Sequence, residues 1–260
     1  MNHVRVHTLQ HVGPHHEPPV FVLVHGIGAS HRYFRRLQHE LAGRGDTHAV
    51  DLPGFGGSPR PRRALSIEQL ASALGDRLDD LGGRRAVVVG HSMGVQVAVA
   101  LALVRPELVS HVVLLGPVTD PDRATALTQA RDLCRDAVRE PVSGNALLLA
   151  DFLRCGPRWY VAELPAMLTY PLLDAVRHVR CPVLVVRGSR DPVARGAWAA
   201  RVSGAAGNGR LVEVPGARHL VQHTDPQRTA AAIGELVESR SCASPPLSRR
   251  PAGTPPRARP

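Results

Sequence analysis

Six short runs rich in Val and Leu recur along the chain, and longer segments with helical spacing separate most of them. The runs do not alternate apolar with polar residues, which is typical of strands buried on both faces of a helix-covered parallel sheet. The pattern therefore predicts an α/β fold with a doubly wound, mostly parallel central sheet. The expected strands are Val20–Val24, Thr47–Val50, Ala86–Val89, His111–Leu115, Pro182–Val186 and Leu211–Val214.

The regular alternation is interrupted between Thr119 and His178, where Leu- and Ala-rich segments are broken by Pro and Gly and no run resembles a strand. We expect several short helices there, inserted into the order of the sheet. The predicted layout is a core of residues 1–118 and 179–240 with a helical segment at 119–178. Residues 241–260 are rich in Pro and Arg and are expected to be disordered, because they bury too little apolar surface to repay their ordering entropy. Residues 3–12 are expected to form an edge strand or hairpin arm, and helices are expected at 31–43, 66–82, 93–105, 193–206 and 225–239.

Composition excludes several classes of protein. With 43% hydrophobic and 21% charged residues in 260, the chain is globular and not disordered throughout. Its net charge of +10 comes from arginine alone, as a GC-rich genome would produce, and aromatics make up only 3%, so we expect no nucleic-acid partner. No apolar run reaches the ~18 residues of a membrane span. Without a secretion signal or a cysteine framework, a cytoplasmic location is expected.

The strongest local motif is Gly90-His91-Ser92-Met93-Gly94, which follows the expected strand Ala86–Val89 and opens a helical segment. A nucleophile on such a tight strand-to-helix turn has strained backbone angles, and glycines on both sides leave space for the turn. The turn would present the Ser92 hydroxyl above the sheet, at a helix N-terminus that favours negative charge. Ser92 is therefore the predicted nucleophile.

A serine hydroxyl needs a general base, which an acid in turn orients. His219 and Asp191 each lie in a loop just after one of the last two expected strands. Catalytic groups of open α/β sheets gather at the carboxyl ends of the strands, so Ser92, Asp191 and His219 are predicted to form a triad. Asp120, which follows the strand ending at Leu115, is the alternative acid.

The third requirement is a site for the developing oxyanion. His25-Gly26-Ile27-Gly28 follows the first core strand, where a backbone N–H can turn toward the serine. The expected donors are the amides of Ile27 and of Met93, the residue after the nucleophile. Both side chains would also wall the acyl pocket.

Together these motifs resemble those of the α/β-hydrolase fold superfamily, in the group of small, capped, cofactor-free serine hydrolases. The resemblance covers about residues 20–238. It implies that 119–178 form a helical cap over the active site and that Asp51–Ser58 form a supporting loop. The arm before Val20 is short, so the usual first strand is expected to be absent or reduced to residues 3–12. The matching segments are His25–Gly28, Asp51–Ser58, Gly90–Gly94, Gly188–Val193 and Gly216–His219.

The predicted function is hydrolysis of an ester-like bond (carboxylester, lactone or thioester) of a small hydrophobic substrate through an acyl-enzyme. Carbon–carbon bond hydrolysis, acyl transfer or lyase chemistry on the same triad remain open, because fold and triad do not distinguish them. A pure binding protein is disfavoured, since it has no need of a complete triad. The oligomeric state is left open.

The segment 119–178 supplies four aromatic residues that we expect to line an apolar substrate pocket: Phe152, Trp159, Tyr160 and Tyr170. If the substrate were charged, Arg154 and Arg158 would be the first candidates to bind it. We expect no cofactor and no metal. The chain has no G-x-G-x-x-G after a strand, and the histidines of the N-terminal arm have no evident Cys or carboxylate partner in the sequence; they are His3, His7, His11, His15 and His16.

Overall fold

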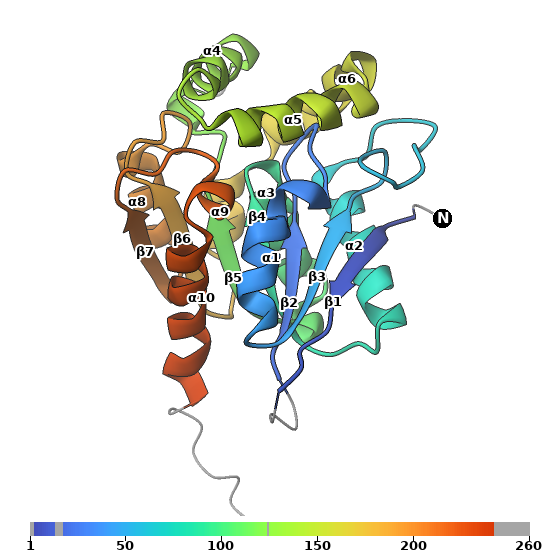
Figure 1. The fold of residues 1–260 in the computed structure, drawn as a ribbon, viewed down its shortest axis with the longest axis vertical. Helices are drawn as coiled ribbons and strands as arrows, with labels where there is room; N and C mark the ends of the chain where they lie inside the picture. The colour runs from blue at the N-terminus through green and yellow to red at the C-terminus, as the bar shows by residue number, and fades with distance from the viewer. Residues whose placement is uncertain (1–2, 14–17, 124, 242–260) are drawn as a thin grey trace, which may run out of the picture.

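The computed structural model describes residues 3–13, 18–123 and 125–241. Their centre is a seven-stranded sheet in the order β1-β3-β2-β4-β5-β6-β7 (Figure 1). All neighbouring strands run parallel except β1, which pairs antiparallel with β3. The strands are β1 (Arg5–Leu9), β2 (Val20–Val24), β3 (Asp46–Asp51), β4 (Ala86–His91), β5 (Val109–Leu115), β6 (Val183–Gly188) and β7 (Gly209–Val214).

The six expected strands are confirmed, and so is the doubly wound α/β class. The N-terminal arm is an edge strand, β1, so the first strand of the sheet is short but present. The tail that the sequence predicts to be disordered lies outside the described residues, which end at Ser241.

Helices cover both faces of the sheet because successive strand residues point to opposite faces and both sets are apolar. Phe21 and Leu23 of β2 belong to the core that also holds residues of α1, α9 and α10. Val22 and Val24 belong to the core shared with α2, α3, α7 and α8. The helices of these two layers are α1 (Arg35–Ala42), α2 (Ile67–Asp80), α3 (Met93–Val104), α7 (Leu172–Val176), α8 (Gly196–Ala205), α9 (Val221–Thr224) and α10 (Pro226–Ser241).

Local signals account for the helix boundaries. Ser66 and Gln69 form a capping box at the start of α2. The segment expected at 31–43 is divided into a 3-10 turn, η1 (His31–Phe34), and α1. A second 3-10 turn, η2 (Pro106–Leu108), joins α3 to β5.

The regular elements among the described residues of 119–178 are helices joined by short turns, and none of them is a strand. Figure 1 shows α4, α5 and α6 beyond the carboxyl ends of the central strands. By contrast, α7 contacts α3 and α8 and so belongs to a layer beside the sheet. The elements of the segment before α7 are η3 (Pro121–Arg123), α4 (Ala126–Ala137), α5 (Val142–Cys155) and α6 (Pro157–Thr169).

Candidate active site

Ser92 occupies a strained turn between β4 and α3. Its backbone has φ 57° and ψ −121°, a region that residues with a Cβ rarely adopt. A Cβ at Gly90 would collide with the Gly94 carbonyl, and one at Gly94 with the Val24 carbonyl, so only glycine fits on either side. The Ser92 amide donates to the Leu115 carbonyl at 3.0 Å and ties the turn to the next strand. The sequence motif therefore folds into the tight turn that it predicts.

His219 and Asp191 are joined as the sequence suggests. His219 Nδ1 donates to Asp191 Oδ2 at 2.9 Å, and both side chains are buried. The other carboxylate oxygen, Oδ1, accepts from the amides of Val193 and Ala194 at 2.8 and 3.0 Å. The alternative acid, Asp120, instead lies 3.6 Å from Arg201.

This pairing sets the protonation of both groups. Burial by itself lowers the pKa of His219, but the charge of Asp191 and its hydrogen bond raise that pKa above 6.5 overall. Burial alone would raise the pKa of Asp191, yet the charge of His219 and the three hydrogen bonds lower it overall. The second imidazole nitrogen, His219 Nε2, is buried with no hydrogen-bond partner among the described residues. His219 and Ser92 both line one cavity.

A relay of buried hydrogen bonds connects the three loops of the site. The Gly26 amide donates to the Tyr33 hydroxyl at 2.8 Å, and that hydroxyl therefore donates to His91 Nδ1, also at 2.8 Å. His91 Nε2 then donates to the carbonyl of His219 at 2.9 Å. Burial and the neighbouring His219 lower the pKa of His91 to about 3, so His91 stays neutral and the direction of the relay is preserved. Neither Tyr33 nor His91 stands out in the sequence as a supporting residue of the site.

The loop after β2 approaches the serine closely. A Cβ at Gly26 would lie 2.9 Å from Ser92 Cβ, so this position requires glycine. Ile27 lines the cavity beside Ser92. Met93 is the first residue of α3, where the amide has no partner within the helix. Its side chain is fully buried in the core and outside the cavity lining, which corrects the expectation that it walls the pocket.

The cavity has a volume of about 560 Å³ and lies between the strand ends and α4, α5 and α6. Phe152 and Tyr160 line it, as expected. Trp159 and Tyr170 do not, because both are packed in the core, where the Trp159 ring lies under the guanidinium of Arg60. Several lining residues of the helices are not evident from the sequence, although an apolar stripe on α5 indicates two of them, Leu148 and Leu149. The missed residues are Leu133, Cys134, Ala137, Asn145, Leu148 and Leu149.

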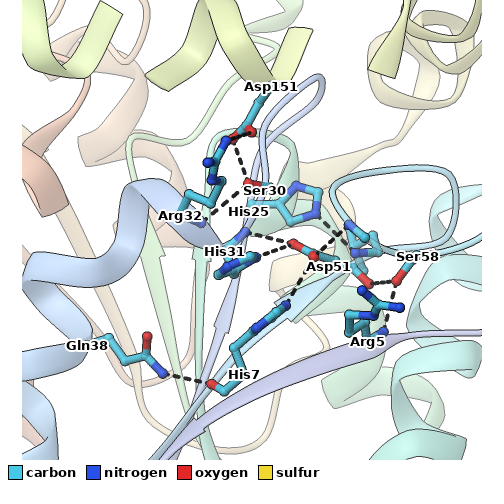
Figure 2. A network of polar contacts seen from close by, with 12 residues as sticks. Arg5, His7, His25, Ser30, His31, Arg32, Gln38, Asp51, Ser58 and Asp151 are labelled. Carbon is cyan, nitrogen blue, oxygen red and sulfur yellow. Dashed lines mark hydrogen bonds and ion pairs between the residues drawn. The ribbon is translucent and has the colours of Figure 1, made fainter. Parts of the chain in front are cut away.

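Asp51 organises the loop that follows β3. Its Oδ1 accepts from both the amide and the Nδ1 of His31 at 2.9 Å, and its Oδ2 accepts from the Gly57 amide at 2.8 Å and from His7 Nε2 at 3.2 Å. Figure 2 shows His7 and His31 beside the carboxylate, and Ser58 donating to the Asp51 carbonyl. Burial favours a higher pKa, but the hydrogen bonds and nearby His25 lower the pKa of Asp51 overall. The loop is thereby held in place without reaching the cavity.

The cluster of His7, His31 and Asp51 is the candidate metal site within the described residues, since its ligand atoms lie within 4.8 Å of one another. The two imidazole rings stack with centroids 3.4 Å apart and planes at 14°. Two imidazoles bound to one ion diverge from it, so near-parallel rings at this distance do not fit a shared metal. Four hydrogen bonds already occupy the carboxylate. His7 thus has a carboxylate partner that the sequence did not reveal, in a hydrogen-bonded cluster.

Asp151 attaches α5 to the loop after β2. It is buried, and its Oδ2 accepts from the Ser30 hydroxyl at 2.6 Å, while Arg32 lies 3.5 Å from its Oδ1 (Figure 2). The helices beyond the strand ends are therefore held by buried polar contacts as well as by apolar packing.

A glycine-flanked serine turn and a buried His–Asp pair, all at the carboxyl ends of a doubly wound sheet, define the class of α/β hydrolases. A profile of the alpha/beta hydrolase family matches residues 21–232, and the chain belongs to this family.

Several similar proteins are named as hydrolases. The chain is 28% identical to the 2-(acetamidomethylene)succinate hydrolase of Mesorhizobium japonicum, over 85% of this chain and 88% of that protein. It is 28% identical to a putative carbamate hydrolase of Pseudomonas savastanoi, over 86% and 95%. The crystal structure of E-2-(acetamidomethylene)succinate hydrolase superposes with a TM-score of 0.75 at 26% identity, over 90% and 95%. An esterase from Thermogutta terrifontis has the same fold, with a TM-score of 0.77 at 20% identity over 91% and 93%.

None of the helices in the described part of the chain combines the length and the apolar character that crossing a bilayer requires.

Proposed function

We propose that this protein is a serine hydrolase that cleaves an ester-like bond of a small hydrophobic substrate through an acyl-enzyme. The observation that carries the proposal is the His219 side chain, which lines the same cavity as Ser92. Its Nδ1 donates to Asp191 at 2.9 Å, while its Nε2 has no hydrogen-bond partner among the described residues. A base oriented in this way is what a serine nucleophile needs.

In the proposed mechanism, Ser92 Oγ attacks the substrate carbonyl carbon while His219 Nε2 takes the hydroxyl proton. Asp191 stabilises the resulting imidazolium. The amides of Ile27 and Met93 donate to the oxyanion of the tetrahedral intermediate. Collapse of the intermediate breaks the carbon–oxygen or carbon–sulfur bond, and the leaving group takes the proton from His219. Water, activated by the same base, then hydrolyses the acyl-enzyme and regenerates Ser92.

We also propose that α4, α5 and α6, within residues 119–178, act as the cap that selects the substrate. Leu133, Leu148, Leu149 and Phe152 turn apolar side chains toward the cavity. Among the described residues, no arginine belongs to its lining, and both Arg154 and Arg158 are exposed. An uncharged, hydrophobic acyl or cyclic substrate suits such a lining better than the succinate named for the relative from Mesorhizobium japonicum.

Acyl transfer, carbon–carbon bond hydrolysis and lyase chemistry would use the same residues. Product analysis distinguishes them: hydrolysis of an ester releases the free acid even when another alcohol is added, whereas a transferase forms a new ester with that alcohol.

The test of the nucleophile uses a fluorophosphonate probe and a panel of p-nitrophenyl esters. Ser92→Ala should abolish labelling and lower kcat by roughly 10³- to 10⁶-fold, the scale seen when a triad nucleophile is removed. The exposed Ser72 on α2 provides a matched control, and Ser72→Ala should label and turn over as the unaltered protein does. Labelling that persists in Ser92→Ala would refute the assignment.

A further inference from the structure

Two buried acids of the helical segment contact the residues on either side of His219. Asp136 lies near the end of α4 and Glu140 in the turn before α5, and they are 3% and 7% exposed. Arg218 Nη1 lies 3.1 Å from Asp136 Oδ1. The Leu220 amide donates to Glu140 Oε1 at 2.9 Å. The helical segment therefore contacts the loop that carries His219 at the residue just before the histidine and at the residue just after it.

Packing in the next turn of the chain strengthens this contact. Ser143 Oγ lies 3.1 Å from His223 Nε2, in the short helix that follows the His219 loop. A Cβ at Gly144 would lie 2.9 Å from Leu220 Cδ1, so α5 approaches this loop as closely as a glycine allows. Polar and apolar contacts thus join the 136–144 corner to the His219 loop.

The two carboxyl groups lie in one buried cluster beside the His219 loop. The nearby charge of Asp136 disfavours ionisation of Glu140, because two neighbouring carboxylates repel each other. Burial is the main cause that raises the pKa of Asp136 and raises that of Glu140 to about 7. Glu140 Oε2 is buried and has no hydrogen-bond partner among the described residues.

We propose that Asp136 and Glu140 are positioning residues for His219, which they act on by fixing the backbone at Arg218 and Leu220 and by placing anionic charge near the imidazole. This inference rests on the proposed role of His219 as the general base. It assigns to the helical segment a part in setting the base, in addition to selecting the substrate.

The charges facing His219 determine the sign of the effect. Asp191, Asp136 and Glu140 each favour the imidazolium and raise the pKa of His219. His91 stays neutral, and the Arg218 guanidinium offsets part of the Asp136 charge. Removing a carboxylate from the pair should therefore lower the pKa of His219. Because the neutral imidazole is the active base, the acid limb of kcat/KM should then move to lower pH.

The experiment compares Glu140→Gln and Asp136→Asn with Asp132→Asn. The first two keep an oxygen acceptor for Leu220 and Arg218 but remove the charge. Asp132 is on the same helix and is buried, but it pairs with Arg123 at 2.7 Å and away from the His219 loop. Histidine-labelled protein is titrated by NMR, with the His219 resonance identified by its loss in His219→Asn, and kcat/KM is measured across pH on an aryl ester.

We expect a lower His219 pKa and a matching shift of the acid limb in Glu140→Gln and Asp136→Asn, and neither in Asp132→Asn. A further variant, Glu140→Leu, removes the acceptor for the Leu220 amide and should lower kcat roughly tenfold with little change in KM, since small displacements of a base are costly. The His219 pKa is read without turnover, so the two hypotheses separate. An unchanged His219 titration in both charge variants overturns the positioning role. The proposed function is overturned instead if His219 titrates as expected in the unaltered protein but that protein neither turns over esters nor is labelled at Ser92.

Discussion

At the scale of single residues, Asp191 gives His219 its proposed capacity as a base. Its Oδ1 is held by two backbone amides, so Oδ2 is fixed in place to receive His219 Nδ1. This bond leaves the proton on Nδ1 and the lone pair on Nε2, which is the tautomer that a serine nucleophile requires.

Replacing the acid should therefore be far more costly at one of the two candidate positions. Asp191→Asn offers an amide to Nδ1, favours the wrong tautomer and should lower kcat by about 10⁴-fold. Asp120→Asn should stay within a few-fold of the unaltered protein, because Asp120 faces Arg201. Steady-state kinetics on one ester compares the two variants, and the opposite ranking would assign the acid to the loop after β5.

At the scale of elements, α6 has two differing faces. Tyr160 turns to the cavity, whereas Glu163 is fully buried against the loop before α2. Glu163 Oε1 has only a long contact of 3.4 Å from the Leu65 amide, and Oε2 has no partner. Burial raises the pKa of Glu163 to about 7, so the folded protein holds a proton there that the unfolded chain releases near pH 4.5.

The linked stability follows from this difference. The favourable contribution is fully present below the unfolded value of 4.5 and is lost as pH rises through about 7. Glu163→Gln should therefore raise Tm at alkaline pH and leave it nearly unchanged in mild acid, as thermal unfolding at several pH values would measure. The exposed Glu235 offers a control, and Glu235→Gln should show no such pH-dependent gain. A Glu163→Gln protein that is less stable at alkaline pH would mean that the charged form is bonded in the fold.

At the scale of the whole molecule, the cavity exists only because the helices lie over the strand ends. Its lining joins β2- and β4-end residues to side chains of α4, α5 and α6. Its size and polarity are therefore properties of the assembled protein, and they should determine which substrate is accepted.

A series of aryl esters of increasing acyl length tests this property. Each added methylene should improve kcat/KM by about 0.8 kcal/mol, or roughly fourfold, until the cavity is filled. Phe152→Ala should move the optimum to a longer acyl chain. The exposed neighbour Leu153, which does not line the cavity, provides the control Leu153→Ala. A flat series, with turnover only of a charged substrate, would contradict the apolar cavity and direct attention to Arg154 and Arg158.

Much of the fold could be predicted from the sequence because its signals are local. An unbroken apolar run indicates a buried strand wherever it occurs, and Ser66 with Gln69 marks a helix start by contacts three residues apart. For residues 3–12 the sequence predicts either an edge strand or a hairpin arm and does not decide between them. The pairing of β1 with β3 depends on residues some forty positions away.

The candidate site divides in the same way. The turn at Ser92 is predictable because Gly90 and Gly94 act within a few residues of it. The direction in which an aromatic ring points is not, and Trp159 and Tyr170 pack into the core while Phe152 and Tyr160 face the cavity. Whether a ring points to the core or to the cavity depends on how α5 and α6 pack against the rest of the molecule.

The sequence by itself thus determined the α/β class, the tight turn of Ser92 and the order of strand ends at which Asp191 and His219 appear. Only the tertiary structure decided that His7 forms a hydrogen bond with Asp51 and that Asp136 and Glu140 contact the His219 loop. The physical reason is the separation along the sequence over which each kind of interaction acts. Steric and hydrophobic preferences act along a few neighbouring residues and leave a readable pattern. Contacts such as that of Glu140 with Leu220, eighty residues apart, form only when separate elements pack, and neither partner carries a mark of the other.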